Sequence, residues 1–144
     1  MKKKKDEQEY VVGFMFSPDK KQVLLIEKLQ PLWQTGLLNG VGGKIEKDET
    51  PIQAMVREFK EEVGMDVEGW GKLLTMNAHD GIVHFFTYTC LSDAFFNTFR
   101  KVEEEQPVAV AVKHIHKVGC VSNLLWMVPL AQQNNTKPFT LYEE

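Results

Sequence analysis

One stretch of the sequence, Gly43 to Met65, gathers residues that could bind a metal ion and a pyrophosphate. Within it, Glu58, Glu61 and Glu62 are spaced so that they share one face of a helix. Like charges this close repel one another, so a positive charge is expected between them. Carboxylates without thiols or a histidine pair favour a hard cation such as Mg²⁺ or Mn²⁺, which usually bridges to substrate phosphates.

Three glutamates taken alone carry little weight, because a solvated helix face is their simpler interpretation. The residues around them favour a functional site: Gly43, five residues, Glu49, seven residues, then Arg57-Glu58-Phe59-x-Glu61-Glu62-x-Gly64-Met65. This pattern resembles the signature of the Nudix hydrolases at every fixed position. So many fixed residues seldom coincide by chance, although the pattern covers only about a sixth of the chain.

The resemblance implies hydrolysis of a nucleoside diphosphate linked to another group, with Mg²⁺ or Mn²⁺ as cofactor. It also implies a set of metal ligands, which are the carbonyl oxygen of Gly43 and the carboxylates of Glu58, Glu61 and Glu62. Arg57 and Glu49 would form an ion pair that orients the loop against the helix, rather than a surface salt bridge of little worth. Which carboxylate is the general base varies within the family and stays open.

The segment from residue 30 to residue 43 alternates proline, tryptophan and glycine, as a functional loop or a tight turn does. Asn39 offers a donor and an acceptor that match a purine edge, although asparagine before glycine is also common in turns. The run from Leu38 to Lys44 resembles Nudix enzymes of oxidised purine nucleoside triphosphates, in which this asparagine contacts the base. We therefore expect Asn39 and Lys44 to face the substrate, with Trp33 as a lid or stacking surface.

The remaining candidate residues rest on the same resemblance. Lys28 is expected to face the phosphates, although a lysine at a strand end is usually only solvated. One glutamate from residues 103–105, with Glu104 preferred, would complete the metal shell or act as base; like charges in a row otherwise indicate an exposed loop. Asn123 and Trp126 would reach the base pocket. Positions 123 and 124 carry Asn and Leu where the oxidised-purine branch has acidic residues, which argues against a preference for an oxidised base.

The helix that carries the glutamates has clear boundaries in the sequence. Thr50 and Gln53 form a capping box around Pro51, and Gly64 marks the end. An apolar stripe at helical period predicts the face that packs on the core, and its members are Ile52, Val56, Phe59 and Val63.

Short apolar segments predict a sheet beside this helix. Residues 10–16 and 22–28 form one predicted hairpin, and residues 70–79 and 82–91 form another around Asp80-Gly81. Residues 108–112 form a further predicted strand. Ser122 would cap a second helix over residues 123–133, with Pro129 kinking or breaking it. Residues 93–101 have no clear pattern, and residues 134–144 form a polar, loosely held tail.

The order of these elements predicts an α/β fold, and the resemblance makes it a Nudix fold, a mixed β-sheet sandwiched between α-helices. At 144 residues with 43% apolar content, the chain suits one domain over residues 10–144, preceded by a disordered tail over residues 1–9. Neither a signal peptide nor a membrane span is expected, and Cys90 and Cys120 are interpreted as reduced thiols, so we expect a cytoplasmic protein.

The formal net charge of −3 gives no general attraction to nucleic acid, and the run Lys2 to Lys5 is most simply a solubilising tail. The expected partner is a small-molecule nucleotide, without a stable nucleic acid complex or a membrane, and with the choice between monomer and homodimer left open. The favoured reaction converts a nucleoside triphosphate, (d)NTP or oxidised purine nucleotide such as 8-oxo-dGTP, into monophosphate and pyrophosphate. The alternatives are ADP-ribose or another sugar nucleotide, a dinucleoside polyphosphate, an RNA cap, or nucleotide binding without turnover.

Overall fold

The computed structural model describes residues 7–133 and 137–143, so the run Lys2 to Lys5 lies outside the described residues. In chain order the elements are β1 (Glu9–Phe16), β2 (Gln22–Glu27), the 3₁₀ helix η1 (Leu32–Gln34), β3 (Leu38–Asn39), β4 (Val41–Lys44), α1 (Pro51–Val63), β5 (Gly71–Ala78), β6 (Gly81–Thr89), α2 (Asp93–Phe96), β7 (Gln106–Ala111), the 3₁₀ helix η2 (Val112–Lys117), α3 (Leu124–Gln133) and β8 (Phe139–Tyr142).

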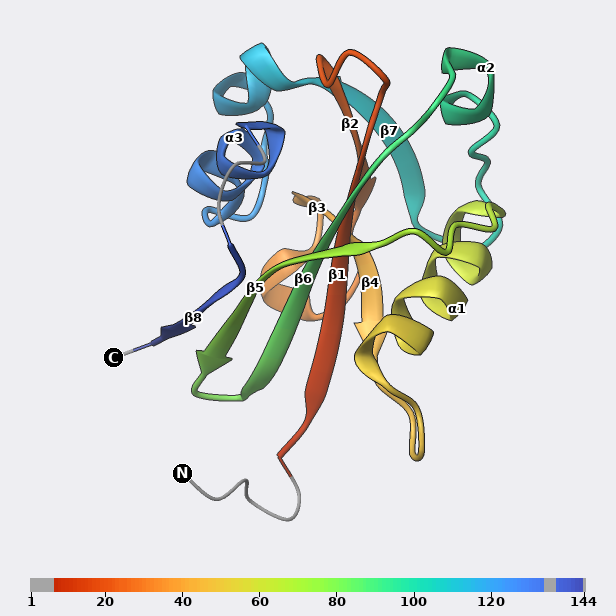
Figure 1. Ribbon diagram of the computed structural model, residues 1–144. Coiled ribbons are helices and arrows are strands. Elements are labelled where there is room, and N and C mark those ends of the chain that lie inside the picture. The colour runs from red at the N-terminus through yellow and green to blue at the C-terminus, as the bar shows by residue number, and fades with distance from the viewer. Residues whose placement is uncertain (1–6, 134–136, 144) are drawn as a thin grey trace.

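The strands form one mixed sheet in the order β3-β2-β1-β6-β5-β8 (Figure 1). β1 is central: it runs parallel to β6, and its other edge pairs first with β4 and then with β2, both antiparallel. β2 also pairs along its length with β7. This sharing of one edge of β1 between β4 and β2 places the glycine-rich strand β4 beside the end of β2.

Helices cover both faces of the sheet, as Figure 1 shows with α1 and α3 on opposite sides. α1 packs on a core that includes Val11, Met15 and Trp70, whereas α3 packs on a second core that includes Phe14 and Leu25. The approach of α1 is close because β1 has a glycine there: a Cβ on Gly13 would lie 2.7 Å from the methyl group of Met55. The predicted Nudix arrangement, a mixed sheet between helices, is confirmed.

α1 has the predicted boundaries. The Thr50 hydroxyl accepts a hydrogen bond from the Gln53 backbone amide, the Gln53 side-chain oxygen accepts one from the Thr50 backbone amide, and Gly64 ends the helix in the left-handed region at φ 74°. The predicted buried stripe is only half right. Phe59 and Val63 are buried, but Ile52 is 42% exposed, and Val56 is only partly buried. The face of α1 that packs on the sheet is the neighbouring one, which includes Ala54 and Met55, because small and flexible side chains permit the closest approach.

Several predicted boundaries need correction. The predicted disordered tail over residues 1–9 is too long, because Glu9 already pairs with Ile82 in the sheet. The end of the chain, predicted to be loosely held, contains β8, which runs parallel to β5. Residues 93–101, which have no clear sequence pattern, begin with α2, which Ser92 caps through the Phe95 amide. α3 continues through Pro129, whose missing N–H does not end the helix.

The hairpins and thiols agree with the sequence. β1–β2 and β5–β6 are antiparallel pairs, and Gly81 adopts φ 150° in the second turn. Cys90 and Cys120 are free, and burial raises the pKa of both thiols, that of Cys90 to about 11. No helix in residues 7–133 or 137–143 is long and apolar enough to span a membrane.

Candidate active site

The loop that leads into α1 is held by a single guanidinium. Arg57 donates from Nε to Glu49 Oε2 at 2.7 Å and from Nη2 to Glu49 Oε1 at 2.9 Å, so the ion pair is bidentate. Nη2 also donates to the Lys44 carbonyl oxygen at 3.0 Å. The hydrogen bond from Arg57 lowers the pKa of Glu49, and Glu49 in turn raises the pKa of Arg57. The structure thus contains the predicted pair, and it ties the loop to both β4 and the helix.

The same guanidinium also contacts two of the predicted metal ligands. Nη1 of Arg57 donates to Glu58 Oε1 at 2.9 Å and to Glu61 Oε2 at 3.1 Å. The Glu61 side chain is 49% exposed, whereas the Glu58 side chain is largely buried. Arg57 therefore supplies positive charge to two of the three glutamates on this helix face.

Glu62 differs from its neighbours because little neutralises it. Its Oε2 atom is buried and has no hydrogen-bond partner. Burial raises the pKa of Glu62 to about 7, the charges of Glu105, Glu58 and Glu103 act in the same direction, and Lys28 opposes them. Burial also raises the pKa of Glu58, although Arg57 works against it. Burial thus disfavours the ionised forms of both Glu58 and Glu62, because the nearby positive charge does not fully compensate for the loss of water.

Gly43 lies directly against Glu58. A Cβ on Gly43 would lie 2.5 Å from Glu58 Oε1 and 2.6 Å from the carboxyl carbon. Any side chain there would displace the Glu58 carboxylate, so the absence of a Cβ brings the β4 backbone and α1 together. The predicted ligands Gly43, Glu58 and Glu62 are thereby placed in one small region.

This region fits a divalent cation in its donor chemistry. Its donors are carboxylate and carbonyl oxygens, which suit Mg²⁺ or Mn²⁺, and the unpartnered Glu62 Oε2 is a buried anion that such an ion would satisfy. Among the described residues, however, no three His, Cys, Asp or Glu side chains already converge as a ready metal site. The contacts of Arg57 give the reason, because they draw Glu58 and Glu61 toward the guanidinium.

The loop glutamate nearest this region is Glu105, whereas the sequence favoured Glu104. Glu104 is exposed. Glu105 is half-buried and forms an ion pair with Lys28, 2.9 Å between Nζ and Oε1. The register explains the difference: Gln106 pairs with Glu27, so the next residues outward, Glu105 and Lys28, face one another across the strand ends. Lys28, predicted to face the phosphates, lines the cavity, and its ion-pair partner is Glu105.

A cavity of about 830 Å³ opens beside the carboxylates, and most predicted substrate residues line it. Lys28, Gly43 and Lys44 line its wall near the metal ligands. Asn39, Asn123 and Trp33 also line it, together with residues that the sequence did not single out: Tyr10, Gln34, Met76, His79, Phe85 and Glu143. A volume of this size is in the range of small-molecule sites.

The carboxamides in the cavity are held in defined positions. Asn39 Oδ1 accepts from the Gly40 amide at 2.8 Å, and Asn39 Nδ2 donates to Gln34 Oε1 at 3.0 Å. Asn123 Nδ2 lies 3.7 Å from the sulfur of Met76. Trp33, on η1, is 63% exposed at the mouth of the cavity. Trp126 was expected in the base pocket, but it is 40% exposed on α3 and is not among the described residues that line the cavity.

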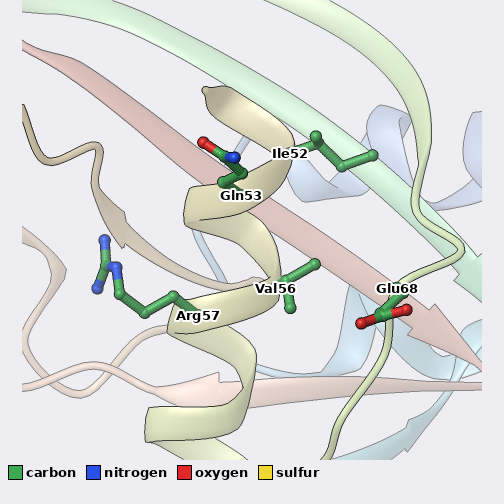
Figure 2. Close-up of a pocket in the computed structure, with 5 residues that line it drawn as sticks. All are labelled: Ile52, Gln53, Val56, Arg57 and Glu68. Carbon is green, nitrogen blue, oxygen red and sulfur yellow. The ribbon is translucent and has the colours of Figure 1, made fainter. Parts of the chain in front are cut away.

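A second hollow, of about 350 Å³, lies beside α1. Ile52, Gln53, Val56, Arg57 and Glu68 line it. Figure 2 shows the guanidinium of Arg57 pointing away from Val56 and Glu68, so the hollow exposes mainly the aliphatic parts of these side chains. Because it contains none of the predicted metal ligands, we assign the site to the larger cavity.

The cavity-lining residues that were not predicted from the sequence come mainly from elements distant in the chain. Glu143 follows β8, and its Oε2 accepts from the His79 amide at 2.8 Å. The alternation of apolar and polar residues over 139–142 could have indicated this strand. Gln34 and Met76 carried no signal, because a glutamine in a loop and a methionine in a strand are unremarkable by themselves.

Comparison with known proteins gives a consistent result. The chain matches the NUDIX domain over residues 7–132. An 8-oxo-dGTP diphosphatase of Proteus vulgaris is 54% identical over 39 residues, which make up 27% of this chain and only about a third, 34%, of that protein.

Solved structures resemble the whole fold at low identity. A MutT protein of Aliivibrio salmonicida or Vibrio cholerae has a TM-score of 0.74 at 23% identity, covering 88% of this chain and 99% of that one. The NUDIX domain of Shewanella oneidensis NrtR, complexed with ADP ribose, has a TM-score of 0.70 at 17% identity over 92% and 91% of the two chains. An ADP-ribose pyrophosphatase of Streptococcus suis has a TM-score of 0.70 at 18% identity over 94% and 98%.

Proposed function

Since this chain belongs to the NUDIX family, we propose that it hydrolyses a phosphoanhydride bond of a nucleotide with the help of Mg²⁺ or Mn²⁺. One observation carries the proposal: the buried, unpartnered carboxylate oxygen of Glu62 lies with Glu58 and Gly43 beside a cavity large enough for a nucleotide. A buried carboxylate without a partner is costly unless a cation joins it. Proteins of this family generally use divalent metal ions.

Glu58, Glu62 and the carbonyl of Gly43 would hold the ion, with Glu61 joining them on release from Arg57. When bound, a divalent ion lowers the pKa of the attacking water and neutralises charge on the phosphate oxygens. Arg57 and Glu49 keep the loop in place, and Lys28 lines the cavity, where its ammonium would donate a hydrogen bond to a phosphate oxygen. A carboxylate of this cluster takes a proton from the water as the water oxygen forms a bond to phosphorus, and the P–O bond to the leaving phosphate breaks. No covalent intermediate is required.

For the substrate we propose a purine nucleoside triphosphate, (d)NTP or its oxidised form, cleaved to monophosphate and pyrophosphate. The amide of Asn39 lines the cavity and offers the donor and acceptor that a purine edge needs. The stretch of 54% identity to an 8-oxo-dGTP diphosphatase supports this class. Asn123 lines the cavity where an acidic residue would favour an oxidised base, so an unmodified purine fits this chain at least as well.

ADP-ribose is the second candidate, because the cavity continues past Asn39 to His79, Asp80 and Glu143 and offers room for a second sugar. Two proteins that share the fold bind or hydrolyse ADP-ribose according to their names. The products distinguish the candidates: a triphosphate gives a monophosphate and pyrophosphate, whereas ADP-ribose gives AMP and ribose phosphate.

The test is a panel of dGTP, dATP, 8-oxo-dGTP, ADP-ribose and a dinucleoside polyphosphate, each with Mg²⁺, Mn²⁺ or a chelator, with products separated by chromatography. We expect metal-dependent release of pyrophosphate from purine triphosphates and none from the Glu62→Gln variant. Binding of nucleotide without any product across the panel would contradict the proposal and favour a binding protein.

A further inference from the structure

The mouth of the cavity is bordered by a short segment, Leu29 to Thr35, which we term the lip. The lip contains η1 and exposes large apolar side chains, with Leu32 at 89% exposure. Gln30, Pro31, Trp33 and Gln34 of this segment line the cavity. The part of the lip that faces the cavity therefore belongs to the site, although no strand of the sheet contains it.

One side chain from a distant loop fastens the first residues of the lip. Glu105 Oε2 accepts from the Leu29 amide at 2.6 Å and from the Gln30 amide at 3.4 Å. Its other oxygen accepts from Lys28 Nζ at 2.9 Å. Both oxygens of the Glu105 carboxylate thus accept hydrogen bonds, and charge-assisted hydrogen bonds of this kind are stronger than neutral ones. The contacts join residues more than seventy positions apart in the chain.

The C-terminal part of the lip is hydrogen-bonded to Asn39, the residue that we propose contacts the base. Gln34 Oε1 accepts from Asn39 Nδ2 at 3.0 Å. Within the lip, Thr35 Oγ1 donates to the Leu29 carbonyl at 2.9 Å, so the residue held by Glu105 is also bonded to the end of the segment. Hydrogen bonds therefore link Glu105 to Leu29 and Leu29 to Thr35, and Gln34, the chain neighbour of Thr35, is hydrogen-bonded to the amide of Asn39.

We propose that Glu105 is a positioning residue for the nucleotide base: it holds the lip in the conformation that orients Asn39 and closes the cavity mouth. This inference rests on the proposed function, because it assigns the base to the Asn39 side of the cavity. This role differs from one in which Glu105 binds the metal ion or activates water. Loss of a positioning residue should weaken substrate binding and change the lip even in metal-free protein, whereas loss of a residue that takes part in the chemistry should lower kcat.

The experiment combines two readouts on Glu105→Ala and Glu105→Gln, with Glu27→Ala as the matched control. Glu27 is an exposed carboxylate next to Lys28, outside the cavity lining. Hydrogen exchange of the lip amides, followed by mass spectrometry on metal-free protein, reports the lip conformation without any catalysis. Steady-state kinetics on the best substrate of the panel then separate KM from kcat.

We expect Glu105→Ala to speed exchange in residues 29–36 by about tenfold or more and to raise KM by about tenfold, the effect of losing a charged hydrogen bond. Strand β2 should exchange as in the parent protein, and Glu27→Ala should match the parent in both readouts. Glu105→Gln keeps an acceptor for the Leu29 amide and should fall between Glu105→Ala and the parent.

The inference would be overturned if the lip amides of both Glu105 variants exchanged hydrogen at the same rate as in the parent protein. A fall in kcat with KM unchanged would also overturn it. Exchange that also rises throughout the sheet in Glu105→Ala would indicate general destabilisation, and the milder Glu105→Gln variant then decides. If the parent protein hydrolyses no nucleotide, the proposed function fails, while the exchange data still test whether Glu105 holds the lip.

Discussion

The two ends of the cavity are built in different ways. At the proposed phosphate end, Gly43, Glu49, Arg57, Glu58 and Glu62 come from β4, the loop after it and α1, and the Arg57 guanidinium contacts Glu49, Glu58 and the Lys44 carbonyl. The proposed base end has contributions from β3, the lip, β5 and the start of α3, and the polar groups around Asn39 are neutral carboxamides. Charge and a rigid local scaffold define one end, and shape and long-range packing define the other.

This difference separates chemistry from specificity. A phosphoanhydride offers the same charges in every nucleotide, so the phosphate end can be fixed by one short pattern. The base varies, and the residues that contact it lie on elements whose relative positions the whole fold determines. Changes at the phosphate end should therefore affect all substrates alike, whereas changes at the base end should affect them unequally.

The largest effect is expected from Glu62→Gln. Replacing the unpartnered carboxylate by a neutral amide should lower kcat by roughly 10³-fold, the scale of losing a group that acts on charge or a proton in the transition state. The loss should be equal for all substrates of the panel, with the fold retained by circular dichroism. A loss confined to one base would break the proposed division between the two ends.

Arg57→Gln should have the next largest effect. It removes the bidentate contact with Glu49 and the contact with the Lys44 carbonyl, so the loop loses its orientation relative to the helix. Residues that orient metal ligands typically contribute 10- to 100-fold, so we expect a fall in kcat of about 30-fold for every substrate. Saturation kinetics at high metal concentration measure it. Recovery of parental kcat at high metal would mean that Arg57 affects only metal affinity.

Asn39→Ala should change specificity more than rate. Loss of the amide should reduce kcat/KM by about tenfold for the preferred purine, the usual cost of one base-edge contact. A pyrimidine triphosphate should lose much less. Competition between the two nucleotides in one reaction measures the ratio directly, and an unchanged ratio would show that the base lies elsewhere in the cavity.

The smallest predicted effect is on stability against pH. Glu62 has a pKa of about 7 in the folded protein against an ordinary 4.5, so the unfolded state loses its proton first as pH rises. Between these values the folded state binds more protons, and the free energy of unfolding therefore falls with rising pH.

In urea titrations of metal-free protein, we expect this group to reduce stability at pH 8 relative to pH 5 by about 1 kcal/mol, discounted for partial exposure. Glu62→Gln should remove that part of the decline. Parallel curves for the parent and the variant would contradict the raised pKa of Glu62.

The same contrast explains what the sequence could predict. Thr50, Gln53 and Gly64 mark the helix through local rules, and the pattern from Gly43 to Gly64 places the charged residues relative to one another. Both hairpins and the Arg57–Glu49 pair were predictable for the same reason. Each depends on residues that are close in the sequence.

The base end was less predictable because its contacts are long-range. Glu105 rather than Glu104 reaches Lys28 because of the register of β7 on β2, which no local pattern reveals. Trp126 is not among the described residues that line the cavity, and the buried side of α3 runs instead through Leu124, Met127 and Val128. Ile52 is exposed because the sheet approaches α1 at Met55 and not along the most apolar stripe.

The central claim is that Glu58 and Glu62 hold a divalent ion against a phosphoanhydride, and titration of Mn²⁺ followed by electron paramagnetic resonance tests it most directly. With a non-hydrolysable purine triphosphate present, the parent protein should bind Mn²⁺ at a saturable site, and Glu58→Gln and Glu62→Gln should each weaken that binding by tenfold or more, about 1.4 kcal/mol. The Asn39→Ala variant should bind Mn²⁺ like the parent. Equal Mn²⁺ affinity in the parent and in both glutamate variants would contradict the account.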